Sequence, residues 1–156
     1  MLTCLPRSIC SWNFLIRGTT GGEAALTFNW FTEQGTIDWN GTEYEVVKHG
    51  PFSGHWTLEG PDGVVIEAQK TSAFTRTFEL DCESGLVTLQ AQSVFTRVFE
   101  LLQSSDVVGT IQPMHMFTRR ATIDCDEGVD EPTQLFAFWL VVITWKRAAA
   151  KNNNSH

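Results

Sequence analysis

The feature that most constrains the fold is an internal repeat. The nonapeptides SAFTRTFEL at 72–80 and SVFTRVFEL at 93–101 are nearly identical and lie 21 residues apart. The pattern extends on both sides, because a phenylalanine recurs every 21 or 22 residues and a leucine or isoleucine follows it six positions later: Phe52 and Leu58, Phe74 and Leu80, Phe95 and Leu101, Phe117 and Ile123, and more weakly Phe31 and Ile37. Such self-similarity indicates a repeated supersecondary unit.

The repeated unit is predicted to be a β-hairpin. Between Phe74 and Leu80 large apolar residues alternate with polar ones, which is typical of a half-buried strand. A stretch of turn-forming residues follows in each repeat, at 59–63, 81–85 and 103–106, and then a second apolar run, at 64–69, 86–92 and 107–112. Asn40-Gly41 marks a further hairpin over 36–47, and strands are also expected at 12–17 and 24–31.

A series of hairpins predicts an antiparallel meander, which would end as a sandwich, a propeller or a closed barrel because exposed edge strands invite aggregation. Propeller blades need about 40 residues each, which is nearly twice the period observed here. A closed barrel fits the spacing better. A chain of 156 residues suits one such domain.

The carboxyl-terminal segment has a different pattern. Residues 135–145, LFAFWLVVITW, are almost entirely apolar, and they are preceded by Asp130, a good N-cap, and followed by Lys146 and Arg147, which suit a last turn. We expect a helix over about 132–149. A run of this length is shorter than the roughly 20 residues that span a bilayer, which favours a buried helix over a tail anchor, an interfacial segment or an oligomer interface.

The barrel and the helix complement each other. A barrel of about 12 strands has a lumen too wide for its own side chains, and a helix about 10–12 Å across would fill it. The predicted fold is therefore mainly β: a closed antiparallel barrel of about 12 strands over residues 12–150, threaded by the C-terminal helix. The repeat phenylalanines are expected to point inward onto Phe136, Trp139, Val142 and Ile143. Residues 1–11 are expected to form an N-terminal extension and residues 151–156 a disordered tail.

A resemblance supports this architecture. The segment GTEYEVVKHGPFSGHWTLEGPDGVVIEAQKTSAFTRTFEL, with LFAFWLVVITWKRAA near the C-terminus, resembles the Tubby C-terminal-like superfamily, which includes Tubby-like proteins, LURP-one-related proteins and phospholipid scramblases, and is most similar to small bacterial members. The resemblance covers about residues 12–150. It implies a barrel of roughly twelve strands around a hydrophobic helix, and basic side chains that bind phospholipid headgroups. Tubby's lysine–arginine lipid motif is not matched.

Three arginines are the candidate ligand-binding residues. Arg76, Arg97 and Arg119 occupy the same place in three successive repeats, on the face that the period of two assigns to the phenylalanines. A buried charge needs a partner, and two interpretations remain open. The guanidinium groups could bind phosphate or carboxylate, or they could brace the strand ends by pairing with helix carbonyls or with Asp81, Asp106, Asp124 or Asp126.

Charge and motifs exclude several function classes. A net charge of −7 argues against nucleic-acid binding. The four cysteines show no zinc spacing, which predicts free thiols in the cytoplasm. The acidic stretch 124–131 lacks the spacing of a calcium loop. No catalytic motif, metal site or cofactor signature is present, so a non-enzymatic protein is expected. The protein is also expected to be a monomer.

The sequence supports two hypotheses for the function. The first is a binding or scaffold module that recognises phospholipid headgroups, a membrane surface or another anionic ligand through Arg76, Arg97 and Arg119. The alternative is a peripheral or tail-anchored membrane protein that uses the apolar segment 135–145.

Overall fold

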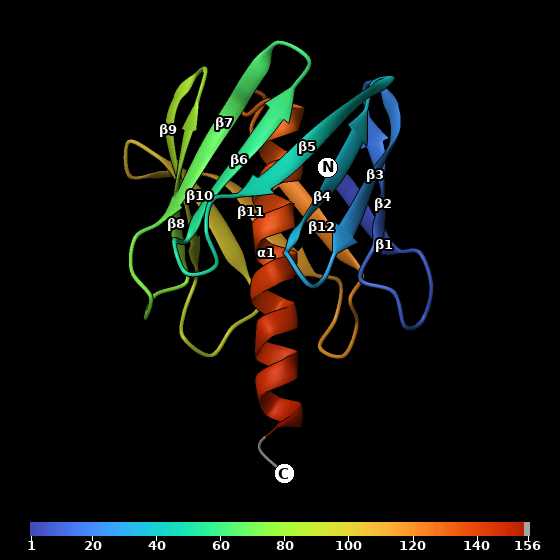
Figure 1. The fold of residues 1–156 in the computed structure, drawn as a ribbon, viewed down its shortest axis with the longest axis vertical. Coiled ribbons are helices and arrows are strands. Elements are labelled where there is room, and N and C mark those ends of the chain that lie inside the picture. Colours follow the sequence, from blue (N-terminus) through green and yellow to red (C-terminus); the bar gives the residue numbers. More distant parts are fainter. Residues whose placement is uncertain (155–156) are drawn as a thin grey trace.

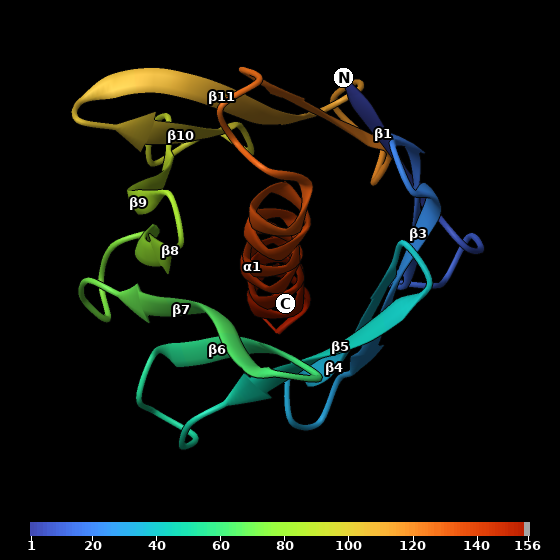
Figure 2. The same ribbon diagram turned by 90° about the horizontal axis from the view of Figure 1, so that it is seen from above.

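Every strand pairs with its neighbours in the sequence, and β1 also pairs with β12, so the sheet closes on itself. The computed structural model describes residues 1–154 and shows twelve antiparallel strands around one helix (Figure 1, Figure 2). The elements are β1 Leu2–Pro6, β2 Phe14–Thr19, β3 Gly22–Asn29, β4 Gln34–Trp39, β5 Thr42–Lys48, β6 His55–Gly60, β7 Gly63–Lys70, β8 Thr77–Cys82, β9 Gly85–Ala91, β10 Phe99–Gln103, β11 Asp106–Pro113, β12 Ala121–Cys125 and α1 Glu131–Asn153.

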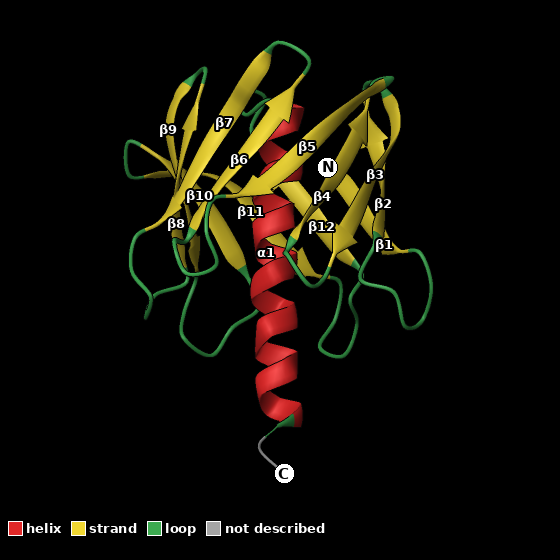
Figure 3. Cartoon of the chain, viewed as in Figure 1, coloured by secondary structure: helices red, strands yellow, loops and turns green. Residues whose placement is uncertain are grey.

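Connections at the two ends of the barrel differ in length. At one end, here called the turn end, hairpins close with two residues, as at Asn40-Gly41, where both residues have positive φ (52° and 76°). At the other, the loop end, six longer loops span 7–13, 30–33, 49–54, 71–76, 92–98 and 114–120 (Figure 3). The alternation of a short turn with a long loop produces the period of 21 or 22 residues.

The predicted inward position of the repeat phenylalanines is wrong for the first phenylalanine of each repeat. Phe52, Phe74, Phe95 and Phe117 lie in the long loops and are exposed, whereas the residues six positions later, such as Leu80, are buried. The pattern of period two continues backwards through Phe74, but β8 begins only at Thr77. Serine and threonine side chains in these loops bond to nearby backbone amides and compete with the sheet ladder.

The helix fills the barrel, as predicted. Phe136, Trp139, Val142 and Ile143 are all buried. Phe138 packs edge-to-face on Phe14 of β2 with ring centroids 4.9 Å apart, and Trp139 stacks on Phe28 of β3. The apolar segment 135–145 is therefore the centre of the core, and it would have to leave the barrel to serve as a bilayer anchor.

Both ends of the helix are fixed to the wall. Asp130 caps the first turn by accepting a hydrogen bond from the amide of Thr133 (2.8 Å), and the Glu131 carboxylate accepts one from the amide of Thr20 in the β2–β3 turn (2.8 Å). At the other end the indole of Trp145 donates to the carbonyl of Arg97 (3.1 Å).

Two predicted boundaries are corrected. Residues 1–11 are not an extension, because β1 closes the barrel by pairing with β12 and β2. The segment 151–156 is not wholly a disordered tail, because α1 continues to Asn153. Alanines at 148–150 extend the helix, since alanine has the highest helix propensity. Residues 155 and 156 lie outside the described residues.

The helix packs so closely on the wall at Gly35 that a side chain does not fit. A Cβ at this position would collide with the carbonyl oxygen of Thr27 and lie 2.8 Å from the ring of Trp139. We expect Gly35→Ala to lower the free energy of unfolding by about 3 kcal/mol, since overpacking a close-packed core typically costs 1–3 kcal/mol or more. Chemical denaturation measures the change. Gly128→Ala, where a Cβ meets no atom within 4 Å, is the control, and equal stability of the two variants would contradict this packing.

Candidate functional site

The loop end carries a ring of protruding apolar side chains, one in each long loop. Their exposed fractions range from 92% to 102%, so they contact almost nothing else in the protein. The members, here called the tip residues, are Ile9, Phe31, Phe52, Phe74, Phe95 and Phe117. Because these side chains bury no surface in the folded chain, they contribute nothing to its hydrophobic core.

Local hydrogen bonds hold the tips outward in a recurring way. The residue two before the tip accepts from the tip amide: Asn29 for Phe31 (3.1 Å), Ser72 for Phe74 (3.1 Å) and Ser93 for Phe95 (3.3 Å). The residue after the tip is a serine or threonine in all five phenylalanine loops. In four of these loops it accepts from the amide two positions on, as Thr96 does from Val98 (3.1 Å). These short-range turns fix the loops without sheet pairing.

Positive charge is concentrated at the same end. All eleven lysines and arginines except Arg17 lie in the long loops, on the strand residues that enter them, or on the last turns of α1: Arg7, Lys48, Lys70, Arg76, Arg97, Arg119, Arg120, Lys146, Arg147 and Lys151. Of the eighteen acidic residues only Glu33 lies there, and the other seventeen are on the barrel wall or at the turn end. A protein of net charge −7 therefore presents one strongly basic face.

The three predicted arginines join neighbouring loops. The guanidinium of Arg76 donates to the carbonyls of Ser93 and Thr96 (2.8 Å) in the next loop. In turn Arg97 donates to Met116 (3.3 Å). Finally Arg119 reaches the first loop and donates to the carbonyls of Ser8 (3.1 Å), Ile9 and Ser11. The arginines thus connect four consecutive loops in a chain.

The sequence predicts helix carbonyls or aspartates as bracing partners of these three arginines. Within residues 1–154 the arginines bond to loop carbonyls instead. Among residues 1–154 no carboxylate lies within ion-pairing distance of Arg76, Arg97 or Arg119, so their positive charge is not neutralised by an acidic side chain. Aromatic rings lie beneath them instead, with Arg97 4.6 Å from the ring centroid of Trp145 and Arg119 5.3 Å from that of Trp12. Burial lowers the pKa of Arg76 and Arg97.

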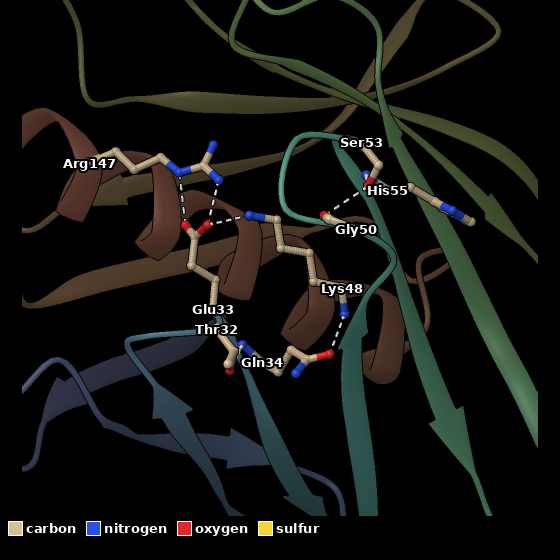
Figure 4. A network of polar contacts seen from close by, with 8 residues as sticks. All are labelled: Thr32, Glu33, Gln34, Lys48, Gly50, Ser53, His55 and Arg147. Carbon is tan, nitrogen blue, oxygen red and sulfur yellow. Dashed lines mark hydrogen bonds and ion pairs between the residues drawn. The ribbon is translucent and has the colours of Figure 1, made fainter.

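Two of the pockets at the loop end are lined by several cationic side chains. Arg76 and Arg97 line a cavity of about 240 Å³ beside Trp145, without Arg119. A larger pocket of about 630 Å³ lies between the loops 49–54 and 71–76 and the end of α1, and contains Lys48, Lys70 and Arg147. Glu33 bridges Lys48 and Arg147 at its edge (Figure 4). The larger of these two cationic pockets is therefore lined by none of the three predicted arginines.

Metal ligands, thiols and membrane-spanning helices are the remaining features that bear on function. Residues 1–154 hold no group of three or more His, Cys, Asp or Glu placed to bind a metal ion. Burial, aided by the nearby Asp124 and Asp126, raises the pKa of the Cys125 thiol to about 12, which keeps it protonated at neutral pH. Within the same residues, no helix has the length and apolarity that crossing a membrane requires.

Sequence reasoning missed the exposed tips and the pocket. The signal for the tips was present, because each phenylalanine is flanked by turn-forming residues, as in Gly50-Pro51-Phe52-Ser53-Gly54. The pocket had no local signal, since its charged residues come from β5, β7, α1 and the loop 30–33.

Arg119 is expected to hold the loop 7–13 rather than the barrel. In Arg119→Gln the amides of this loop should exchange hydrogen at least about tenfold faster, since hydrogen bonds from charged groups contribute about 1.5–3 kcal/mol. Exchange in the strands should not change. Hydrogen exchange measured by mass spectrometry checks this, with Arg120→Gln as the matched control because its exposed side chain makes no hydrogen bond within residues 1–154. Equal exchange in both variants would rule out the bracing role.

Comparisons of this chain with protein-family models, with curated proteins and with solved structures found no match. The resemblance to the Tubby C-terminal-like superfamily therefore stays a prediction from the sequence.

Proposed function

We propose that this protein is a non-enzymatic module that docks peripherally on anionic membrane surfaces through its loop end. The observation that carries the proposal is the coincidence of six fully exposed apolar tips with ten of the eleven cationic side chains on one end of the barrel. Exposed apolar groups rimmed by polar residues mark membrane or protein interaction sites, and positive charge selects an anionic partner.

The separation of the tips favours a lipid bilayer over a folded protein partner. Each tip stands on its own loop, and the loops surround the end of α1 (Figure 2). Interfaces between proteins require a contiguous, well-packed core, whereas isolated aromatic side chains can each enter fluid lipid independently. Lysines and arginines near an anionic leaflet contribute about 1 kcal/mol each. The cytoplasmic leaflet, which carries the anionic lipids, is the surface that fits.

The distribution of charge would also orient the protein. With its acidic residues on the wall and at the turn end, the barrel would approach an anionic surface loop end first, because the opposite end is repelled. The last turns of α1 project past the loops (Figure 1). They carry Arg147, Lys151 and small or amide side chains, which polar headgroups can solvate.

Vesicle flotation tests the proposal. Wild-type protein should float with phosphatidylcholine vesicles that contain phosphatidylserine, less so as salt is raised, and not with phosphatidylcholine alone. The variant Phe74→Ser/Phe95→Ser/Phe117→Ser should bind at least about tenfold more weakly, because each buried phenylalanine contributes on the order of 1 kcal/mol or more. Failure of the wild-type protein to float at low salt would refute membrane docking and leave an acidic protein as the partner for this face.

The matched control is Val64→Ser/Leu86→Ser/Val107→Ser. These three residues are also solvent-exposed and apolar (58%, 55% and 53%), but they follow turns at the opposite end. The control variant should bind as the wild-type protein does. A similar loss in both variants would show that apolar surface in general, rather than the loop end, drives the association.

A further inference from the structure

The larger pocket at the loop end is distinct from the three repeat arginines. It has a volume of about 630 Å³ and lies between the loops 49–54 and 71–76, with Trp56 of β6 and the end of α1 contributing to it. This volume falls within the range of sites that hold small molecules, about 300–1,000 Å³. Its charged lining consists of Glu33, Lys48, Lys70 and Arg147.

Cations outnumber carboxylates in this pocket. The Glu33 carboxylate accepts from the ammonium of Lys48 (2.7 Å) and, through both of its oxygens, from the guanidinium of Arg147 (2.6 and 2.8 Å; Figure 4). No carboxylate among residues 1–154 lies within ion-pairing distance of Lys70. One negative charge is therefore set against three positive charges, and two remain unneutralised.

Within residues 1–154 the pocket also contains side-chain N–H donors that have no acceptor. An ammonium group has three N–H donors and a guanidinium has five, and Glu33 occupies one from Lys48 and two from Arg147. Burial and then the positive charge of Arg147 lower the pKa of Lys70. A bound anion would relieve both effects, because it would supply a partner and neutralise the neighbouring charge.

Glu33 keeps the cations in place. Its backbone is left-handed (φ 59°), which is costly for a residue with a side chain, and its two ion pairs offset that cost. Burial would raise the pKa of Glu33, but the hydrogen bonds from Arg147 and Lys48 outweigh it and lower the pKa. The carboxylate thus stays ionised at neutral pH and positions two of the three cations before any ligand arrives.

We propose that this pocket binds a phosphate monoester. Such a group carries about 1.5–2 negative charges at pH 7 and three acceptor oxygens, which matches two unneutralised positive charges better than the single charge of a phosphodiester. The exposed ring of Phe52 also lines the pocket, so a lipid headgroup could be held there while Phe52 enters the bilayer. The lipid source of the phosphate rests on the proposed function, whereas the phosphate chemistry does not.

Calorimetric titration with soluble probes tests the pocket itself. Glycerol 3-phosphate, a monoester, should bind more tightly than glycerophosphoserine, a diester. Lys70→Gln should weaken glycerol 3-phosphate binding at least about tenfold, since a charge-assisted hydrogen bond and one of two uncompensated charges are lost. Arg120→Gln removes one charge from the same end of the barrel, outside the pocket, and should change the affinity less than about twofold. Equal losses in the two variants, or no binding of glycerol 3-phosphate, would overturn the proposal.

Vesicle flotation identifies the source of the phosphate. Vesicles with phosphatidic acid, a monoester lipid, should bind more tightly than vesicles with phosphatidylglycerol at matched surface charge, and Lys70→Gln should abolish that preference. The variant Phe74→Ser/Phe95→Ser/Phe117→Ser should weaken binding to both and keep the preference. Binding of both vesicles without preference would uphold membrane docking and overturn the pocket as a lipid site. Glycerol 3-phosphate binding without any vesicle binding would uphold the pocket for a free phosphate and refute membrane docking.

Discussion

The packing of α1 inside the barrel holds the whole fold together. A helix that is apolar on every side is stable only when it is surrounded, and a twelve-stranded barrel is too wide to be filled by its own side chains. The edge-to-face contact of Phe14 with Phe138 and the stacking of Phe28 on Trp139 show how the wall meets the helix. Neither part has a core without the other, so strands and helix form one cooperative unit.

Closure of the barrel also determines at which rim each connection lies, and therefore where the charged and exposed apolar side chains gather. In a closed meander successive connections alternate between two ends, so every second one lies at the same rim. Here the short turns lie at one rim and the long loops, with nearly all the cations and the exposed tips, at the other. A chain of net charge −7 acquires a basic, apolar face in this way, and its overall charge says little about what that face can bind.

Much of the architecture was predictable because its signals are local. Alternation of period two, turn residues at regular spacing and one continuous apolar run predicted the hairpins, the barrel and the helix with its cap at Asp130. The N-terminal strand was missed because its evidence is not local: Leu2 pairs with Ile123, at the other end of the strand series. The first phenylalanine of each repeat was misplaced because alternation in the sequence continues past the point where the strand ends, as at Phe74.

The repeating hairpin, the all-apolar helix and the need for each to bury the other follow from periodicity and hydrophobicity along the chain. The contacts of the charged residues, in contrast, depend on how the whole chain folds. The arginines donate to carbonyls of a neighbouring loop, as Arg76 does to Thr96, and Glu33 forms ion pairs with both Lys48 and Arg147. Such contacts join residues that are far apart in the sequence, and they depend on how the barrel closes, on its register and on where the helix leaves it, none of which is encoded in a local pattern.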